Sequence, residues 1–296
     1  MGFLHDALVD IVLTTPTVGA TILFALGIVF IYRASRILNL AHGAMAMVPA
    51  YIFISVSRHA GRYVGLVAAL AFGAALGLLM DRTVVRRLRS SSSLAQTVGT
   101  VGVLGLLLAL AVEFWGTAPQ EAPSIFPQHV FMIGFSRMTL GDVGLFVVAV
   151  ALAGLFVALF RFTDLGLAMS CAADNRTAAR LMGIDPDRTT AIAWMFAGIL
   201  AALGGVLLGA SNYFTPYTLA LNVLPAFVVA LLGGMDSIVG VVWASIVVGL
   251  VRGIVPTLGS FGQVSGATEV AIGVLAFAVM AMRGRRYALA DSGGSL

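Results

Sequence analysis

Residues 189–235 read TTAIAWMFAGILAALGGVLLGASNYFTPYTLALNVLPAFVVALLGGM and contain no charged side chain. A membrane-spanning helix needs about 20 mostly apolar residues, so this stretch is long enough for two spans. Its middle, 212–218, is polar and aromatic and carries Pro216, which favours an interfacial turn. The pattern therefore predicts a pair of membrane helices at 190–211 and 220–235.

Other charge-poor segments occur along the whole chain. Charged residues make up 10% of the sequence and hydrophobic residues 60%, whereas a soluble protein has about 25% charged residues. Such a composition excludes a soluble enzyme, a nucleic-acid-binding protein and a disordered scaffold. We predict one all-α integral membrane domain over 1–296 with eight or nine transmembrane segments, one of the short ones broken or re-entrant. The expected spans are 11–32, 41–57, 63–80, 94–115, 141–160, 190–211, 220–235, 238–255 and 266–282.

Arginine placement predicts the orientation of these segments. Cytoplasmic loops of membrane proteins carry an excess of basic residues. Three arginine clusters therefore mark the cytoplasmic side, with an external N-terminus, a cytoplasmic C-terminus and location in the inner membrane. Arg58 and Arg62 fall on the outside, against the rule. The clusters are Arg82, Arg86, Arg87 and Arg89; Arg161, Arg176, Arg180 and Arg188; and Arg283, Arg285 and Arg286.

The loop 161–188 is charged but carries helix start and stop signals. Asp174 can cap a short helix, and Gly183 stands where a left-handed residue would end it. Asp185-Pro186 then opens the next span. The short helix would present an apolar face and a basic face, which suits either docking to a partner or contact with lipid headgroups. The apolar face comprises Ala178, Ala179, Leu181 and Met182; the basic face comprises Arg176 and Arg180.

Three motifs in order resemble a known family. The stretch Asp164–Ile184 is similar to the cytoplasmic coupling loop of LivH-type permeases, the membrane subunits of ABC importers for branched-chain amino acids. Ile37-Leu-Asn-Leu-Ala-His-Gly43, followed by Ala50-Tyr51, resembles the N-F-A-H-G segment of that family. Ala226–Ser237 resembles its A-x-x-x-G-G-x-G-S stretch.

The resemblance implies an ABC importer permease architecture and a division of labour among subunits. A second related permease, two cytoplasmic ATP-binding subunits and an extracytoplasmic solute-binding protein would complete the transporter. The chain has no phosphate-binding G-x-x-x-x-G-K-[ST] loop, in line with ATP hydrolysis elsewhere. We expect no cofactor, metal site or nucleic-acid partner, and contact with membrane lipid. The alternative is a secondary transporter or channel that works without ATP.

The resemblance also implies which residues couple the permease to its ATPase. They lie in the short helix and its end: Asp174, Arg176, Ala178, Ala179, Arg180, Leu181, Met182 and Gly183.

Candidate residues for the translocation path are few. Asn39 and His42 share a helix face beside Gly43, and Gly233-Gly234 interrupts two apolar runs. The structural alternatives are helix capping by Asn39 and an interhelical hydrogen bond from His42.

The remaining acidic and glycine residues near the spans have simpler structural explanations. Asp236 can cap the helix from 238, Glu113 can face external water, and Glu269 suits the first turn of the last span. The pairs Gly73/Gly77 and Gly205/Gly209 suit close helix contact. With so few fixed charges in its spans, the chain is expected to form a permissive path without a high-affinity site.

Overall fold

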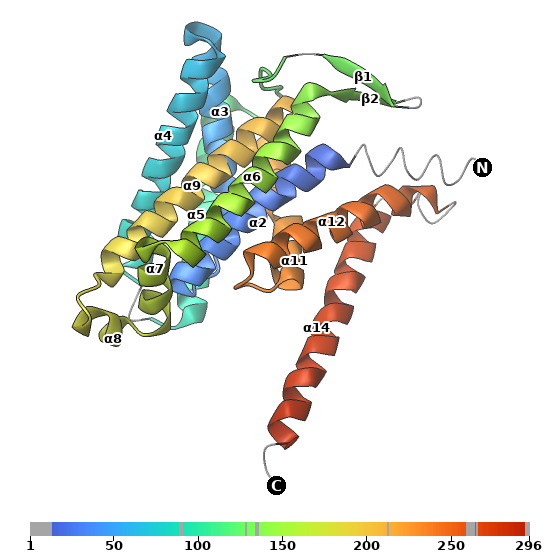
Figure 1. Cartoon of the computed structure of the whole chain (residues 1–296). Coiled ribbons are helices and arrows are strands. Elements are labelled where there is room, and N and C mark those ends of the chain that lie inside the picture. The colour runs from blue at the N-terminus through green and yellow to red at the C-terminus, as the bar shows by residue number, and fades with distance from the viewer. Residues whose placement is uncertain are drawn as a thin grey trace.

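The computed structural model describes residues 14–88, 91–127, 129–133, 136–211, 213–258, 264 and 266–293. Nearly all of this part is helical (Figure 1). The helices are α2 (Thr15–Ser35), α3 (His42–Ala60), α4 (Arg62–Met80), α5 (Ser93–Trp115), α6 (Leu140–Phe162), α7 (Asp164–Asp174), α8 (Arg176–Leu181), α9 (Pro186–Ser211), α10 (Pro216–Leu221), α11 (Val223–Gly233), α12 (Ile238–Ile254) and α14 (Ala267–Gly293). A π-helical turn, Asp81–Val85, continues α4, and a 3₁₀ turn, Val255–Thr257, continues α12.

Six helical segments of the described chain are long and apolar enough to cross a membrane. They are α2, α4 with its π turn, α5, α6, α9 and the α10–α11 pair. Helix α12 and residues Ala267–Ala281 are shorter apolar helices. The mostly helical membrane fold is confirmed, whereas the count of eight or nine spans stays a prediction. The first expected span begins at 11, but residues 1–13 lie outside the described part.

The loop between α5 and α6 corrects the all-α expectation. It contains an antiparallel hairpin of β1 (Val130–Ile133) and β2 (Ser136–Thr139), with Val130 opposite Thr139. The hairpin lies at one end of the helical bundle (Figure 1). Its first strand consists of Val, Phe, Met and Ile, of which Val, Phe and Ile favour strands. Strand pairing also satisfies backbone groups of a segment that no helix includes.

Helix α9 lies at the centre of the packing, against α2, α3 and α4. Its contacts with α3 and α4 are made backbone to backbone through glycines. A Cβ atom added to Gly77 would overlap the carbonyl oxygen of Trp194, and one added to Gly198 would overlap that of Gly73. A Cβ on Gly205 would likewise meet the carbonyl oxygen of Ala46 in α3. The predicted close contacts of Gly73, Gly77 and Gly205 are therefore confirmed.

The chain between α2 and α3 folds back into the bundle. Arg36 ends α2 in a left-handed conformation (φ 58°). The ring of His42, the first residue of α3, packs where a side chain on Gly27 would be. Gly27 precedes Arg36 by nine residues, about 13 Å along a helix. Residues 37–41 therefore run inward without helical structure, and Ile37, Asn39 and Ala41 are buried, so protein covers non-helical backbone at this depth.

The glycine contacts generate a matched pair of substitutions. Gly198→Ala should destabilise the bundle by about 1–3 kcal/mol, because α4 must move away from α9. Gly105→Ala adds the same methyl group where no atom lies within 4 Å, and should be neutral or slightly stabilising. Thermal unfolding of both purified variants in detergent measures the difference. Equal unfolding temperatures would contradict the packing described here.

Candidate coupling loop and translocation path

The connection between α6 and α9 is built from two short helices, α7 and α8. Asn175 separates them: its Oδ1 accepts hydrogen bonds from the backbone N–H groups of Thr177 and Ala178, both at 3.0 Å. Asn175 is thus the N-cap of α8, and the assignment of that role to Asp174 is wrong. Asp174 is the last residue of α7 instead.

The end of this connection has the helix stop and start signals that the sequence predicts. Gly183 has φ +81°, and the N–H of Ile184 donates to the carbonyl oxygen of Ala179 at 3.0 Å, which closes α8. Asp185 Oδ1 accepts from the backbone N–H groups of Asp187 (2.9 Å) and Arg188 (3.3 Å), which lowers the pKa of the Asp185 carboxyl. Pro186 is the first residue of α9.

Arg36 joins three connections that are far apart in the sequence. Its Nη2 lies 3.0 Å from Asp174 Oδ1, and its Nη1 lies 2.5 Å from Asp236 Oδ1. These two hydrogen-bonded carboxylates raise the pKa of the guanidinium further. Asp236 therefore does not cap α12; the cap is Ser237, whose Oγ accepts from the N–H of Gly240 at 3.0 Å.

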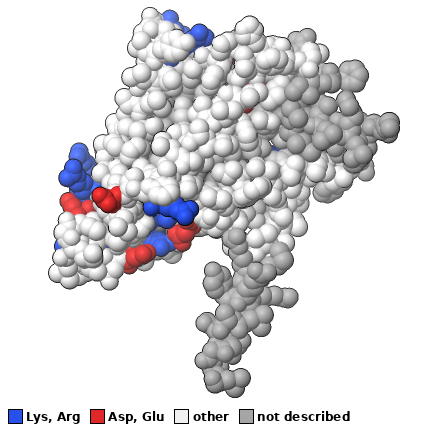
Figure 2. Space-filling view, viewed as in Figure 1, with Lys and Arg blue, Asp and Glu red and all other residues white. Residues whose placement is uncertain are grey.

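A second group of charges holds α8 against the start of α9. Asp187 pairs with Arg176 and lies 3.7 Å from Arg180. The backbone oxygen of Asp187 accepts from Arg86 Nη2 at 3.2 Å, and Arg86 Nε lies 2.7 Å from the buried carboxylate of Asp81. Of the predicted basic face, Arg176 is therefore turned toward its own protein, whereas the Arg180 side chain stays 59% exposed. These contacts also place Arg86 of the first arginine cluster beside Arg176 and Arg180 of the second at one end of the bundle, where charged side chains gather in Figure 2.

The predicted apolar face of α8 is divided between the interior and the surface. Ala179 is only 2% exposed and packs inward, whereas Leu181 is 86% and Met182 75% exposed. Ala178 is also exposed. The grouping of Ala179 with an exposed face is wrong, because the helix turns that residue toward its own protein. The coupling role of the loop stays a prediction.

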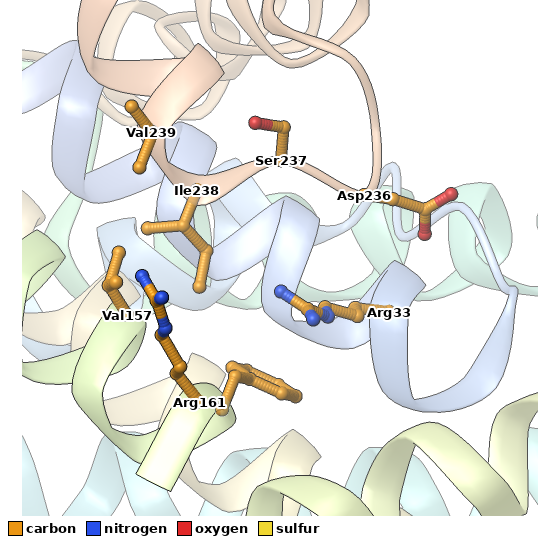
Figure 3. Close-up of a pocket in the computed structure, with 8 residues that line it drawn as sticks. Arg33, Val157, Arg161, Asp236, Ser237, Ile238 and Val239 are labelled. Atoms are coloured by element: carbon orange, nitrogen blue, oxygen red, sulfur yellow. The ribbon is translucent and has the colours of Figure 1, made fainter.

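A cavity of 390 Å³ opens beside the Arg36 contacts (Figure 3). It lies between α2, α6 and the start of α12. Arg33 and Arg161 come from the ends of α2 and α6, and the Arg33 guanidinium stands 4.3 Å from the centre of the Phe160 ring. Asp236 and Ser237 contribute the remaining polar groups.

The first three candidate path residues are packed into the bundle. Asn39 Oδ1 accepts from the N–H of Ala41 at 3.1 Å, so it shapes the turn before α3. His42 is fully buried, and in the described chain neither ring nitrogen has a hydrogen-bond partner. The interhelical hydrogen bond considered for it is absent there. Gly43 lets α3 approach the carbonyl oxygen of Ala220 in α10.

The two glycines near Asp236 shape the turn between α11 and α12. Gly233 packs against Gly240, and Gly234 has φ +90°. Gly233 also lines an apolar cavity of 340 Å³ with Trp243 and Leu275. A path role for these five residues stays a prediction. In the described ranges, His, Cys, Asp and Glu form no group of three that could hold a metal ion.

Sequence reasoning missed Arg36 as the centre of the ionic contacts. Its partners are 138 and 200 residues away, so no local spacing reveals them. The sequence offers no local signal for these pairs, because both carboxylates are largely exposed and need no partner on grounds of burial.

Comparison with known proteins places the chain in a family. Residues 11–282 match the family described as branched-chain amino acid transport system / permease component. No solved structure matches the chain.

Individual relatives cover most of the sequence. The chain is 27% identical over 240 residues to the probable permease protein LivH of Methanocaldococcus jannaschii, covering 77% of this chain and 75% of that protein. It is 27% identical over 261 residues to LivH of Escherichia coli K12, covering 82% and 83%. It is 29% identical over 253 residues to BraD of Pseudomonas aeruginosa, covering 79% and 81%. The match across nearly the whole length shows that this multi-pass membrane chain belongs to the family of permease components of branched-chain amino acid transport systems.

Proposed function

We propose that this chain is one of two related permeases in an ABC importer that carries branched-chain or similar small amino acids across the inner membrane. A permease component works with ATP-hydrolysing and solute-binding components of its system. Here these would be two cytoplasmic ATP-binding subunits and an extracytoplasmic binding protein. The names of LivH and BraD, which state branched-chain amino acid transport, support this solute class.

The observation that carries the proposal is the anchored loop of α7 and α8. An element that transmits force from an ATPase must expose side chains to its partner and be tied firmly to the transmembrane helices. Leu181 and Met182 supply exposed apolar groups, and Met adapts its shape readily to a partner surface. The contacts of Asp174 and Asp187 tie the loop to α2, α9 and the end of α4.

The alternatives receive less support from the same contacts. A helix lying on lipid headgroups would direct its arginines to phosphate, but Arg176 pairs with Asp187, and Arg180 lies 3.7 Å from the same carboxylate. A secondary transporter or channel without an ATPase would have no use for an anchored loop of this kind.

We propose that the end carrying α7 and α8 faces the cytoplasm, with the N-terminus outside. The arginines at 82–88 and 161–188 support this orientation. Arg58 and Arg62, at the opposite end, have local partners: Arg58 donates to Gln120 Oε1 at 3.5 Å and Arg62 to the backbone oxygen of Ser124 at 3.2 Å. Structural roles in the outer loop thus account for these two exceptions. The side chains at 283–286 lie outside the described residues.

Substitution of Leu181 tests the docking element. Leu181→Ala should lower ATP-driven uptake several-fold while the permease still inserts, because truncating one of the few side chains that anchor an interface costs more than about 1 kcal/mol of binding. Leu94→Ala, which alters an exposed leucine of α5 at the same end, is the matched control. Uptake and ATPase activity of the reconstituted transporter are measured together. Wild-type coupling in Leu181→Ala would show that α8 does not dock the ATPase.

Arg36→Gln tests the tie between the loop and the bundle. Removing the charge releases Asp174 and Asp236 together, so we expect ATP hydrolysis to continue with less solute moved per ATP. Arg33→Gln removes a neighbouring guanidinium without breaking those pairs and serves as control. The ratio of uptake to ATP hydrolysis is the measurement, and an unchanged ratio in Arg36→Gln would refute the tie.

Cysteine labelling tests the orientation. In a Cys171→Ala background, a membrane-impermeant maleimide added to intact cells should label Pro123→Cys and miss Thr177→Cys, since both positions are exposed but lie at opposite ends. Inverted vesicles should reverse the result. Labelling of position 177 from outside would overturn the proposed topology.

A further inference from the structure

A polar cavity of 500 Å³ lies at the end of the bundle opposite the coupling loop. Its walls come from the first turn of α2, the junction of α10 and α11, the last turn of α12 and the first turn of α14. Helix α12 begins beside Asp236, at the Arg36 contacts, and Arg252 stands fourteen residues further along, about 21 Å by helical rise. In the proposed orientation the cavity therefore opens on the extracytoplasmic side.

Arg252 is the unusual feature of this cavity. It lies in α12, an otherwise uncharged helix of a chain poor in charge, and its Nε is buried without a hydrogen-bond partner in the described residues. A buried guanidinium nitrogen without a partner is costly. Ionisable groups inside membrane segments commonly mark the path of a substrate. The guanidinium has five N–H donors in a planar fork, which fits a carboxylate at two points.

Glu269 supplies the opposite charge across the same cavity. It is exposed in the first turn of α14, and its charge acts on Arg252 from beyond ion-pair distance. Thr17 and Thr268 add hydroxyl groups to the walls. The cavity thus offers the guanidinium of Arg252 to an anionic group and the carboxylate of Glu269 to a cationic group.

The cavity extends inward to a helix break. Asn222 lines it and separates α10 from α11. The residues on either side of this break, Ala220 and Val223, are those against which Gly43 packs at the inward start of α3. Interrupted helices near the middle of a membrane protein are a recurrent setting for substrate sites.

We propose that this cavity receives a zwitterionic amino acid, with its α-carboxylate on Arg252 and its α-ammonium group on Glu269. The proposal rests on the proposed transport of amino acids and names the groups that recognise the solute in this subunit. Binding is weak, because the solute must move on. Any amino acid with free carboxylate and ammonium groups fits, and the side chain contributes little selection.

Ligand-observed NMR on the intact permease–ATPase complex in nanodiscs, without the binding protein, tests the site. The probes are L-leucine, leucinamide, which lacks the carboxylate, and 4-methylpentanoate, which lacks the ammonium group. We expect leucine to bind at least about tenfold more tightly than either analogue, since a hydrogen bond to a charged group contributes about 1.5–3 kcal/mol. This comparison uses the wild-type protein and needs no variant to fold.

Two substitutions then assign the groups. Arg252→Gln should abolish the preference for leucine over leucinamide, and Glu269→Gln the preference for leucine over 4-methylpentanoate. A merely structural role would lower all affinities together. Arg62→Gln and Glu113→Gln neutralise charges at the same end outside the cavity and should leave both preferences intact.

Equal binding of leucine and leucinamide to the wild type, or an unchanged preference in Arg252→Gln, would overturn the proposal. ATP-driven leucine uptake, measured in parallel, separates this failure from failure of the proposed function. If leucine is taken up but the analogues bind as tightly as leucine, the proposed binding site is wrong and the proposed importer function is retained. If leucine binds more tightly than the analogues but is not taken up, the proposed binding site is supported and the proposed importer function is wrong.

Discussion

Direct backbone contact of α9 with α3 and α4 is the constraint on which the rest of the structure depends. Apolar side chains gain little by leaving lipid for one another, so helix association in a membrane depends on close packing. Gly198 and Gly205 bring α4 and α3 against α9, and Gly27 admits the ring of His42 from the inward start of α3. With these helices fixed, α2 ends where Arg36 can reach both the α7–α8 loop and the start of α12.

The ion pairs of Arg36 and Asp187 link helices to one another and add little to stability. Exposed ion pairs contribute little stability, typically 0 to about 1 kcal/mol, and Arg36 and its two partners are all partly exposed. What they provide is connection: one guanidinium links α7 to the turn before α12, while Asp187 links α8 to α9. A movement of α8 would therefore displace helices from both halves of the chain. Such a mechanical connection is what the proposed coupling of this loop to an ATPase requires.

Sequence reasoning located the helices well because apolar runs and charged punctuation are strong signals in a charge-poor chain. It also identified the glycine contacts and the end of α8 at Gly183, where the backbone conformation itself selects the residue. It failed where two explanations competed for one side chain. Asp174 and Asp236 both suit helix caps by position, yet both bind Arg36, because long-range pairing leaves no trace in local spacing. The direction in which Ala179 faces likewise depends on how α8 packs against α9, which local sequence does not determine.

His42 and Arg252 show why a polar residue within a membrane segment is ambiguous until its surroundings are known. His42 sits in a conspicuous motif, but its ring fills the space beside Gly27 and contacts the edge of Phe24, with no solvent access. Arg252 belongs to no motif, but it adjoins open space that also carries an opposite charge. A solute can exchange contacts only with groups that it can reach. The space beside a side chain, rather than its polarity, therefore decides whether it can serve in transport.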